Sequence, residues 1–434
     1  MGAYEETLAY LTGLEVSAGW DLKLERMRAA LALRGHPERA WPALHVAGTN
    51  GKGSTAAMLE AVLRASGRRT GLYTSPHLVD FTERMRVDGR TIPVDVVVRK
   101  VATLRAVLGA AGIALTHFEF TTLIAFEWFR DVGIDVAVVE VGLGGRLDAT
   151  NLCVPIATAI TTIAHDHEEW LGHTLPEIAA EKAGIVKAGV PVVVGRMPPD
   201  ADAVIVARAA DVGAPLHRAP PLVADGDALA FADGDVRWDG LRLGLPGRFQ
   251  RDNAAVALAT LACVQDRLPC RPADVRDGLA AARWPGRLAV VDGGPSLVLD
   301  GAHNPAGAAA LAEELAAIRG DRRAVLLFAV MADKAWPAIL APLLPLVAQV
   351  VVTRVGRRGL EPARVVDALA GRTPATAVEE PRAALAAARA AAGPDGLVVV
   401  TGSLFLVGEV YAATRIPLFE PWQGSAPGAT GAAQ

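Results

Sequence analysis

The sequence ALHVAGTNGKGSTAAMLEAVLRASG occupies residues 43–67 and changes character twice along its length. Apolar residues at 43–47 predict a buried strand, the glycines from 48 to 53 predict a loop, and the apolar periodicity that follows predicts a helix ending near Gly67. Backbone N–H groups of such a loop, a helix N-terminus and the ammonium of Lys52 can together neutralise a polyphosphate. The stretch therefore predicts a phosphate-binding α/β fold.

The loop departs from the common phosphate-loop pattern GxxxxGK[ST] at two positions. Val46 stands where the first glycine is usual, and Gly53 separates Lys52 from Ser54. The alternative is a glycine-rich turn beside a surface lysine, but the strand before it and the helix after it favour phosphate binding. The hydroxyl of Ser54 or Thr55 could also hold Mg2+. The predicted nucleotide contacts of the loop are Thr49, Asn50, Gly51, Lys52, Gly53 and Ser54.

Short β-branched runs recur along the chain, each followed by a glycine-rich or polar loop and then by a stretch rich in alanine and leucine. This alternation is typical of a parallel α/β sheet, whose ligands bind beyond the carboxyl ends of the strands. The first series of expected strands comprises residues 43–47, 136–141, 156–163 and 190–194. Residues 222–245 contain short alternating segments and Asp-Gly turns instead, and predict a small antiparallel insertion.

A second series of strands predicts a second, smaller α/β domain. Its expected strands lie at 297–299, 324–330, 350–353 and 397–401, separated by helical stretches such as 306–318. We place the boundary near 284–287, which gives domains at 1–287 and 288–423, and we expect residues 424–434 to form a disordered tail. The expected fold is α/β: a P-loop-containing N-terminal mononucleotide-binding domain with a mainly parallel sheet and a small antiparallel insertion, then a Rossmann-like C-terminal domain.

Composition narrows the class of function. Apolar residues make up 52% of the 434 residues and charged residues 21%, which suits globular cores. The net charge of -4 gives no support to nucleic-acid binding, so small-molecule partners are expected. The start of the chain lacks signal-peptide character and prolines interrupt the uncharged run at 335–353, so no membrane span is predicted. Three scattered cysteines form no metal motif, and a cytoplasmic protein is expected.

Beyond the phosphate loop, further sequence blocks resemble those of one enzyme family, in the family's order. With GTNGKGS at 48–54 they are similar to the folate branch of the Mur ligase superfamily, the folylpolyglutamate and dihydrofolate synthases, over nearly the whole chain. Such a series is far more specific than any single motif. The blocks are TSPHL (74–78), FTERMRVDG (81–89), HFEF (117–120), VEVGLGGRLDATN (139–151), DHEEWLG (166–172), EKAGIVK (181–187), WPGR (284–287), LDGAHNPAG (299–307) and TGSLFLVGEV (401–410).

This resemblance implies a bifunctional, ATP-dependent amide ligase. Members of the family join L-glutamate to dihydropteroate or to (tetrahydro)folate through an acyl phosphate, because a carboxylate must be activated before an amine can attack it. ATP and Mg2+ are the implied cofactors, the latter as two ions. We expect the protein to act as a monomer on these small molecules.

Four alternatives to this function are weighed. Two of them belong to the superfamily. One is a folylpolyglutamate synthase without dihydrofolate synthase activity, and the other is a ligase for a peptidoglycan precursor. The HFEF and SPHL blocks disfavour the peptidoglycan ligase. A P-loop kinase or GTPase would not account for the LDGAHNP loop of the second domain. A non-catalytic nucleotide-binding protein would not need Lys52, Glu140 and Lys182 together.

The metal site is implied mainly by the family pattern. Glu140 ends an apolar strand, where an ionised carboxylate needs a partner. The resemblance makes that partner Mg2+, whereas a salt bridge to Arg146 is the alternative. His167 alone would be read as a surface histidine, because Mg2+ prefers oxygen ligands. The implied metal ligands are Ser54, Ser75, Glu140, His167 and Lys182.

Lys182 is one of only six lysines in the chain, and it corresponds to the lysine that is carbamylated in this superfamily. A neutral amine can add CO2 to form a carbamate, whose anionic oxygens could bind or orient a metal ion. The alternative is an ordinary salt bridge with Glu181 or Glu177. The implied catalytic residues are Lys52, Lys182 and His303.

The remaining contacts also come from the family pattern. Asn253 could instead be a helix N-cap, Phe118 could fill the core, and the residues around Asp300 could cap their own loop. The implied nucleotide contacts outside the phosphate loop are Asn253, Arg287 and Asp300. The implied substrate contacts are Asp21, Leu22, Phe118, Glu119, Asp148 and Ser403.

Overall fold

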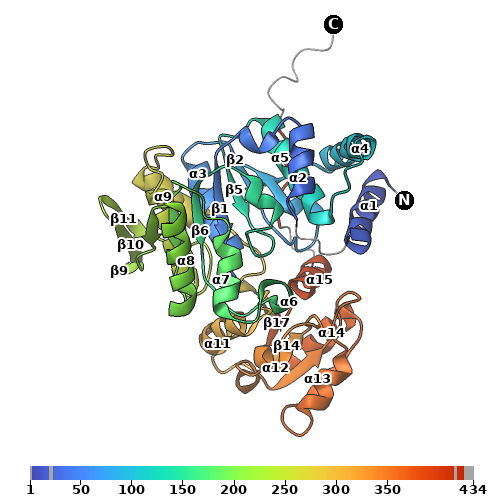
Figure 1. Ribbon diagram of the computed structural model, residues 1–434. Coiled ribbons are helices and arrows are strands. Elements are labelled where there is room, and N and C mark those ends of the chain that lie inside the picture. Colours follow the sequence, from blue (N-terminus) through green and yellow to red (C-terminus); the bar gives the residue numbers. More distant parts are fainter. Residues whose placement is uncertain (1, 19–22, 415–417, 425–434) are drawn as a thin grey trace.

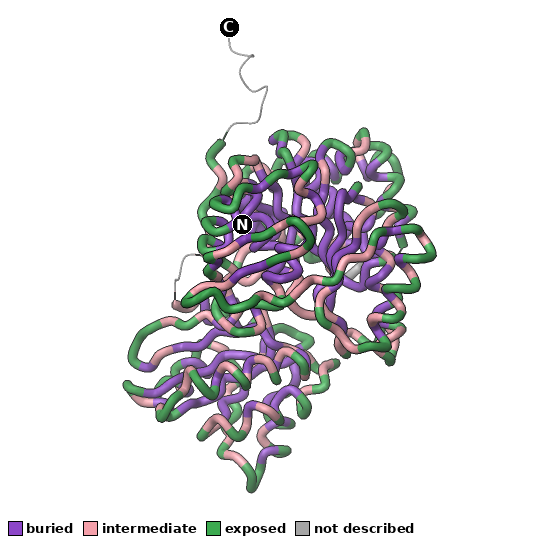
Figure 2. Tube along the Cα trace, turned by 90° about the vertical axis from the view of Figure 1, so that its left-hand side faces the viewer, coloured by how far each residue is buried: buried purple, intermediate pink, exposed green. Residues whose placement is uncertain are grey.

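The computed structural model describes residues 2–18, 23–414 and 418–424 of the chain. Figure 1 shows a larger body, coloured blue to yellow, and a smaller orange body below it. The larger body contains an eight-stranded sheet with a three-stranded sheet beside it, and the smaller body contains a six-stranded sheet. Buried residues fill the middle of both bodies in Figure 2, so each has a core of its own.

The eight-stranded sheet is mainly parallel, as the sequence predicts. Its strand order is β4-β3-β2-β5-β1-β6-β7-β8. The strands from β2 to β8 in this order run parallel, whereas β3 is antiparallel to both β2 and β4. The strands are β1 (Ala43–Ala47), β2 (Thr70–Tyr73), β3 (Met85–Val87), β4 (Arg90–Thr91), β5 (Val136–Glu140), β6 (Pro155–Ile160), β7 (Val192–Val194) and β8 (Leu216–Arg218).

Helices cover both faces of this sheet because alternate strand residues point to opposite sides. Leu44 and Val46 of β1 join the core beneath α3, α9 and α10, whereas Ala43 joins the core beneath α2, α4 and α5. The helices of this body are α1 (Ala3–Ala18), α2 (Glu25–Leu33), α3 (Lys52–Ala65), α4 (Val94–Ala110), α5 (His117–Val132), α6 (Glu168–Leu171), α7 (Leu175–Ala183), α8 (Pro199–Val212), α9 (Gln250–Ala262) and α10 (Pro272–Ala281).

The predicted antiparallel insertion is present as a three-stranded sheet. Its strands are β9 (Val223–Asp225), β10 (Ala228–Asp233) and β11 (Val236–Leu241). The rings of Phe231 and Trp238 stack with centroids 5.5 Å apart and belong to the same core as the buried side of α3. The insertion therefore packs on α9 and α10, and these two helices pack on α3.

The smaller body is the predicted second α/β unit. Its strand order is β12-β13-β17-β14-β15-β16, in which β12 is antiparallel to β13 and the other pairs are parallel. The strands are β12 (Ala289–Val291), β13 (Ser296–Leu299), β14 (Ala324–Phe328), β15 (Gln349–Val352), β16 (Ala375–Ala377) and β17 (Leu397–Thr401). The helices are α11 (Pro305–Arg319), α12 (Trp336–Leu340), α13 (Pro362–Leu369), α14 (Pro381–Ala392) and α15 (Leu404–Thr414).

The predicted strand 156–163 is too long, because β6 ends at Ile160. The N–H of Thr161 still donates to the carbonyl oxygen of Ala47 at 3.0 Å, but the residue lies beyond the strand, and its hydroxyl lies 2.6 Å from the carbonyl oxygen of Asn50. The apolar pattern continues beyond the strand because the chain is still buried there. A pattern of burial alone does not distinguish a strand from a buried loop that turns toward a site.

The two bodies are connected between Ala281, where α10 ends, and Ala289, where β12 begins. The proposed boundary at 287/288 lies inside this connection. The chain also returns to the larger body after α15, since Pro421 forms a parallel bridge with Thr91. Of the expected tail, only Gly424 lies among the described residues. In the part of the chain that the structure describes, no helix is both long and apolar enough to cross a membrane.

Candidate active site between the two bodies

The phosphate loop connects β1 to α3 and needs glycine at two positions. Gly48 and Gly51 have φ angles of 144° and 85°, which residues with a side chain rarely adopt. A Cβ on Gly48 would lie 1.9 Å from Oγ1 of Thr161, and a Cβ on Gly51 would lie 2.1 Å from Oδ1 of Asn253. The loop therefore lies tightly between the end of β6 and the start of α9.

Lys52 begins α3 and folds back over the loop. Its Nζ donates hydrogen bonds to the carbonyl oxygens of Gly48, at 3.0 Å, and Thr49, at 3.1 Å. Burial lowers the pKa of Lys52, while the negative charges of Glu140 and Asp166 act in the opposite direction. The ammonium lies where it can meet phosphate oxygens bound by the same loop.

The helix α9 supplies polar side chains to the other side of the loop. Nε2 of Gln250 donates to Oγ of Ser54 at 3.3 Å, and Nδ2 of Asn253 donates to Oε1 of Gln250 at 2.8 Å. Asn253 lies in the first turn of α9, and Phe249 holds the N-cap position, so the capping alternative for Asn253 is wrong. Gln250 was not predicted as a site residue, because nothing in the sequence marks a buried glutamine as a neighbour of the loop.

Glu140 ends β5 with its carboxylate buried and, among the described residues, no salt bridge to it. Oε2 accepts a hydrogen bond from the backbone N–H of Ser75 at 3.2 Å. Burial raises the pKa of Glu140, and the charge of Lys52 opposes that shift. The alternative partner Arg146 pairs instead with Glu181, at 2.7 Å. A buried carboxylate without a salt bridge is suited to act as a ligand of a metal cation.

Lys182 lies on α7 and is buried against the phosphate loop. Its Nζ donates to the carbonyl oxygen of Gly48 at 3.0 Å. Burial, together with the positive charge of Lys52, lowers the pKa of Lys182 to about 7. The salt-bridge alternatives are not formed, since Glu181 pairs with Arg146 and Glu177 caps its own helix. A neutral amine is thus populated at this position near pH 7.

Asp166 follows β6 and faces the smaller body. Nζ of Lys334 lies 2.6 Å from Oδ1 of Asp166, and Nε2 of His303 lies 3.3 Å from Oδ2. Burial alone would raise the pKa of Asp166, but the hydrogen bond from His303 and the surrounding positive charges lower it well below its usual range. The neighbouring His167 has its pKa lowered to about 4, mainly by burial. The two bodies therefore meet across a buried carboxylate.

Arg287 and Asp300 lie where the bodies join. Asp300 accepts hydrogen bonds from the backbone N–H groups of Leu288 and Ala302, both at 2.8 Å. Burial raises the pKa of Asp300, and the charge of Arg287 lowers it in part. The same arginine charge acts on Glu140, so Arg287 faces the phosphate-loop site. Contact of Arg287 or Asp300 with a nucleotide stays a prediction.

Ser403 and His303 are brought together at one edge of the second sheet. They follow β17 and β13, which are parallel neighbours, and the N–H of Gly402 donates to the carbonyl oxygen of Ala302 at 2.9 Å. Nδ1 of His303 lies 2.8 Å from the carbonyl oxygen of Gly301. Both predicted residues therefore lie at the carboxyl ends of neighbouring strands, and His303 reaches Asp166 of the larger body.

The predicted substrate contact Phe118 lies beside the loop that follows β5. A Cβ on Gly142 would be 2.4 Å from the Phe118 ring, and the ring centroid is 6.1 Å from that of Tyr73. This half-buried position is compatible with a face that stacks on a flat ligand. Two other predicted substrate contacts, Asp21 and Leu22, lie outside the described residues.

Two further predicted substrate residues already hold backbone groups. Glu119 forms a capping box with Thr116 at the start of α5, and its Oε2 accepts from the N–H of Thr116 at 2.7 Å. Asp148 is buried and accepts from the N–H groups of Leu143, at 2.8 Å, and Thr150, at 3.0 Å. A substrate group would compete with these bonds, so the substrate roles of Glu119 and Asp148 stay predictions.

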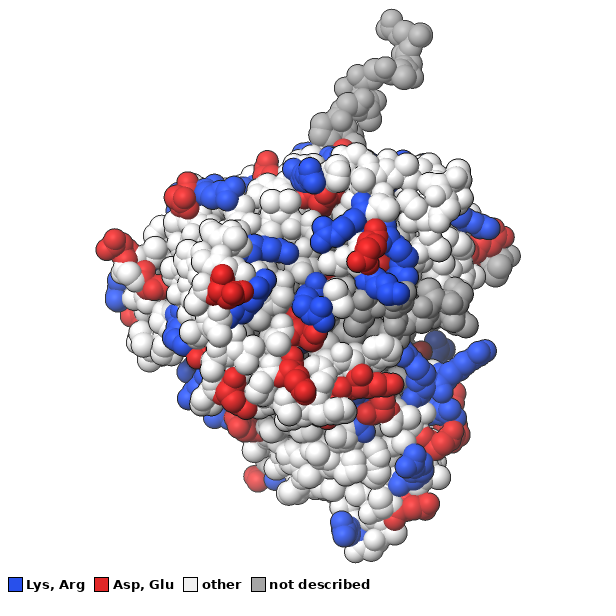
Figure 3. Space-filling view, in the orientation of Figure 1, with Lys and Arg blue, Asp and Glu red and all other residues white. Residues whose placement is uncertain are grey.

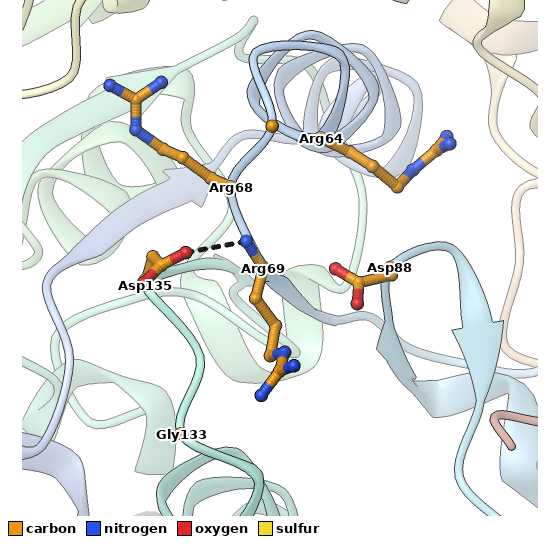
Figure 4. A pocket seen from close by; sticks show the side chains of 7 residues that line it. Arg64, Arg68, Arg69, Asp88, Gly133 and Asp135 are labelled. Atoms are coloured by element: carbon orange, nitrogen blue, oxygen red, sulfur yellow. Dashed lines mark hydrogen bonds between the residues drawn. The ribbon is translucent and has the colours of Figure 1, made fainter. Parts of the chain in front are cut away.

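On the face shown in Figure 3, the surface outside this site has no large patch of charge of one sign. Figure 3 shows basic and acidic side chains interspersed over both bodies. An open cavity of about 560 Å³ lies beside residues that precede β2 and β5. It is therefore at the amino ends of the strands, whereas the phosphate loop is at their carboxyl ends. The cavity's three arginines point apart in Figure 4. The cavity is lined by Arg64, Gly67, Arg68, Arg69, Asp88, Gly133 and Asp135.

Comparison with known proteins places this geometry in a family. The model of the Mur ligase middle domain matches residues 46–195, and that of the Mur ligase glutamate ligase domain matches residues 286–404. The chain is 37% identical to folylpolyglutamate synthase of Lacticaseibacillus casei over 425 residues, which is 94% of this chain and 97% of that relative. The chain belongs to the Mur ligase family, in its folylpolyglutamate synthase branch.

Solved structures agree with this assignment. The Mur ligase described here is similar to Escherichia coli FolC in complex with DHPP and ADP, with a TM-score of 0.86 and 34% identity over 94% of this chain and 98% of that one. It is also similar to a bifunctional folylpolyglutamate synthase/dihydrofolate synthase with Mn, AMPPNP and L-glutamate bound, with a TM-score of 0.86 and 35% identity over 94% and 98% of the two chains. The predicted two-part fold is confirmed.

Of the predicted metal ligands of this Mur ligase, Glu140 has surroundings that suit a divalent cation, and the roles of Ser54, Ser75, His167 and Lys182 stay predictions. Among the described residues, no three His, Cys, Asp or Glu side chains are clustered as a metal site would require. Mg2+, however, keeps several waters and binds through one or two carboxylates together with substrate phosphates. The buried carboxylate of Glu140, with the Ser75 backbone beside it and the phosphate loop opposite, provides that kind of site.

Proposed function

We propose that this Mur ligase joins L-glutamate both to dihydropteroate and to reduced folates, using ATP and passing through an acyl phosphate. Similar structures hold DHPP and ADP, or AMPPNP and L-glutamate, which supports these substrates. The observation that carries the proposal is the gathering of Lys52, Lys182 and Glu140 around one phosphate loop. A ligase needs such a concentration of charge where a carboxylate anion meets a triphosphate.

The first step transfers a phosphoryl group. A carboxylate oxygen of the pterin substrate attacks the γ-phosphorus, and the bond from that phosphorus to the bridging oxygen of ADP breaks. Lys52, held over the loop by the carbonyl oxygens of Gly48 and Thr49, neutralises charge on the phosphates. Glu140 would hold the divalent cation, which supplies further neutralisation of the phosphate oxygens.

The second step forms the amide. The amine of glutamate attacks the carbonyl carbon of the acyl phosphate, inorganic phosphate leaves with the electrons of the C–O bond, and the amine loses a proton to solvent. His303 faces an oxygen with each ring nitrogen, the carbonyl oxygen of Gly301 and the carboxylate of Asp166. The ring lies beside the phosphoryl-transfer site, so we assign His303 to hydrogen bonding with the leaving phosphate.

The finer metal chemistry is part of the proposal. We infer two cations, one held by Glu140 with Ser75 and the other by Glu140 with His167. Lys182 would orient the second ion as a carbamate, since its amine is buried at the phosphate loop with its pKa lowered to about 7. We also propose that the protein acts as a monomer in the cytoplasm, where its three free cysteines would stay reduced.

One parallel assay tests the substrates. Purified protein with ATP, Mg2+ and L-glutamate is offered dihydropteroate, tetrahydrofolate or a UDP-sugar peptide, and glutamylated product and phosphate are measured. Product from both pterins is expected. Product from tetrahydrofolate alone would remove the dihydrofolate synthase activity, and turnover of the UDP-sugar peptide alone would refute the folate assignment. Phosphate release without any acceptor would favour a nucleotidase.

The phosphate-loop assignment is tested with Lys52→Ala. Removal of a cation aimed at the transferred phosphate should cost about 3 kcal/mol of transition-state stabilisation, or roughly 100-fold in kcat. Arg99→Ala is the matched control, because it also removes a cation but from an exposed pair with Asp95. Near-normal turnover of Lys52→Ala would mean that the loop does not hold the reacting phosphates.

A further inference from the structure

Asn304 follows His303 in the LDGAHNPAG block and uses its whole hydrogen-bonding capacity. It is buried, with 2% of its surface exposed. Oδ1 accepts from the N–H of Gly307 at 2.8 Å and from Nδ2 of Asn50 at 3.2 Å. Nδ2 donates to Oδ1 of Asn50 at 2.9 Å and to Oδ2 of Asp166 at 3.0 Å. A primary amide has two donor hydrogens and two acceptor lone pairs, so every position is filled.

The four hydrogen bonds of Asn304 reach three different parts of the structure. The bond from Gly307 caps α11 of the smaller body. The paired bonds with Asn50 reach the phosphate loop, which follows β1, and the bond to Asp166 reaches the loop that follows β6. The strands β1 and β6 are neighbours in the sheet, so one side chain of the smaller body spans two adjacent loops of the larger body.

The hydrogen bond from Asn304 is not needed to neutralise the carboxylate of Asp166. Lys334 already places a positive charge 2.6 Å from it, and Nε2 of His303 lies 3.3 Å away. Asn304 contributes a neutral donor whose other bonds are tied to Asn50. Its effect is therefore to set the distance between the two loops, which carry Lys52 on one side and His167 on the other.

We propose that Asn304 is a positioning residue that couples docking of the smaller body to assembly of the phosphoryl-transfer site. When the bodies are docked, Asn304 holds the phosphate loop and the Asp166–His167 loop in one relation; when they separate, both loops lose that restraint together. This inference rests on the proposed ligase function. It differs from a nucleotide or glutamate contact, since Asn304 acts through Asn50 and Asp166.

Two substitutions separate the capping of α11 by Asn304 from its contacts with the two loops of the larger body. Asn304→Ser and Asn304→Asp both keep an oxygen that caps α11, because serine, aspartate and asparagine are all favoured N-cap residues. Serine is too short to reach the opposite loops. Aspartate keeps the acceptor but loses both donors, and it places a second carboxylate beside Asp166. Neither variant should therefore unfold the helix, while both should uncouple the loops.

The experiment measures kcat, the KM values, ADP dissociation and thermal unfolding for the wild type and the two variants with Mg2+ present. We expect kcat to fall at least tenfold in both, with the melting temperature within about 2 °C and the ADP dissociation constant within threefold. The exchange variant Asn304→Asp with Asp166→Asn restores a donor opposite an acceptor at the same net charge. It should recover at least fivefold over Asn304→Asp alone.

The outcomes separate this inference from the proposed function. Unchanged kcat in Asn304→Ser, or a loss of kcat matched by an equal loss of ADP binding and of thermal stability, would overturn the positioning role. If the wild type ligates no glutamate, the proposed function fails. The effect of Asn304 on docking of the smaller body can still be measured by solution scattering. The ADP-bound wild type should then be more compact than Asn304→Ser, and equal radii of gyration would overturn the inference.

Discussion

Lys182 illustrates how surroundings change the chemistry of a side chain. An ammonium at the phosphate loop would repel a cation, but burial and the charge of Lys52 lower the pKa of Lys182 to about 7. The neutral amine, which adds CO2, is populated above that pH and disappears below it. We therefore predict that activity in CO2-depleted buffer falls, that bicarbonate restores it, and that the restoration weakens as the pH drops below about 7.

Two observations would complete this test. A high-resolution structure grown with bicarbonate should show three extra atoms on Nζ of Lys182, and Lys182→Ala should lose activity that short carboxylates partly restore. Lys100→Ala serves as a control, because Lys100 is paired with Glu127 and Asp131. A bare lysine together with a fully active Lys182→Ala protein would rule the carbamate out.

His45 makes a second prediction at this scale, on stability. It lies in the middle of β1, with Nε2 2.9 Å from Oγ1 of Thr150, and burial lowers its pKa to about 3. The unfolded chain takes up a proton near pH 6.5 and the folded protein does not until about pH 3, so acidification through that window favours unfolding. Between pH 7.5 and 5.5, this one histidine should cost about 1.4 kcal/mol.

Urea unfolding of the wild type and of His45→Gln at these two pH values measures the effect. Glutamine can still hydrogen-bond to Thr150 but does not titrate. The wild type should lose more free energy of unfolding between pH 7.5 and 5.5 than the variant does, by about 1.4 kcal/mol. Parallel losses in the two proteins would show that His45 is protonated in the folded state.

The N-terminus of α5 joins a structural residue to a candidate substrate residue. Glu119 completes the capping box with Thr116, whereas Phe118 packs on the loop after β5. We predict that Glu119→Ala lowers the free energy of unfolding by about 1 kcal/mol and changes the KM for dihydropteroate less than threefold. Phe118→Ala should raise that KM at least tenfold at little change in stability. The reverse pattern would assign substrate binding to Glu119.

The elements of this fold follow closely from local patterns. The predicted strands 43–47 and 397–401 have the observed bounds, because apolar runs buried on both faces end where a polar or glycine loop begins. Glu140 and Lys52 were found from their place at a strand end and in a glycine loop. Asp166 and Gln250 were missed as site residues because the contacts that bring them to the site, with Asn304 and Ser54, come from residues more than 100 positions away in sequence. Only the packed fold brings such groups together.

Besides the contacts of Asp166 and Asn304, two segments of the chain tie the bodies together, the connection at 281–289 and the segment 418–424. Leu418 packs on the core of the smaller body, and Trp422 packs on the core of the larger one. Between them, the N–H of Thr91 donates to the carbonyl oxygen of Glu420 and the N–H of Trp422 donates to that of Thr91, both at 2.9 Å. The segment 418–424 thus spans both bodies after α15.

Arg86 of β3 links the two ties. Its guanidinium lies 4.1 Å from the ring centroid of Phe419, in the returning segment, and 4.8 Å from that of Trp284, in the connection between the bodies. Burial lowers the pKa of Arg86 to about 10, and no described residue accepts a hydrogen bond from its Nε or Nη2. The two rings, together with the negative charges of Glu60, Glu83 and Glu140, therefore help to compensate the buried cation.

We predict that a chain ending at Thr414 is less stable and less able to close than the full chain. Removal of Phe419 and Trp422, both half-buried, should lower the free energy of unfolding by about 3 kcal/mol and leave Arg86 without one of its two rings. A chain ending at Gly424 is the matched control, because it keeps the whole described segment. Calorimetry should show a lower melting temperature only for the shorter chain.

The same pair of truncations tests domain closure. ATP analogue and folate together should compact the full chain in solution scattering, because the nucleotide and the carboxylate substrate must meet between the bodies. With one of two ties removed, the smaller body can move about the single connection near Arg287, so the chain ending at Thr414 should stay more extended under the same ligands and have lower kcat. Equal compaction and equal kcat in both truncated chains would show that the segment 418–424 stabilises the larger body alone and does not restrain movement between the two.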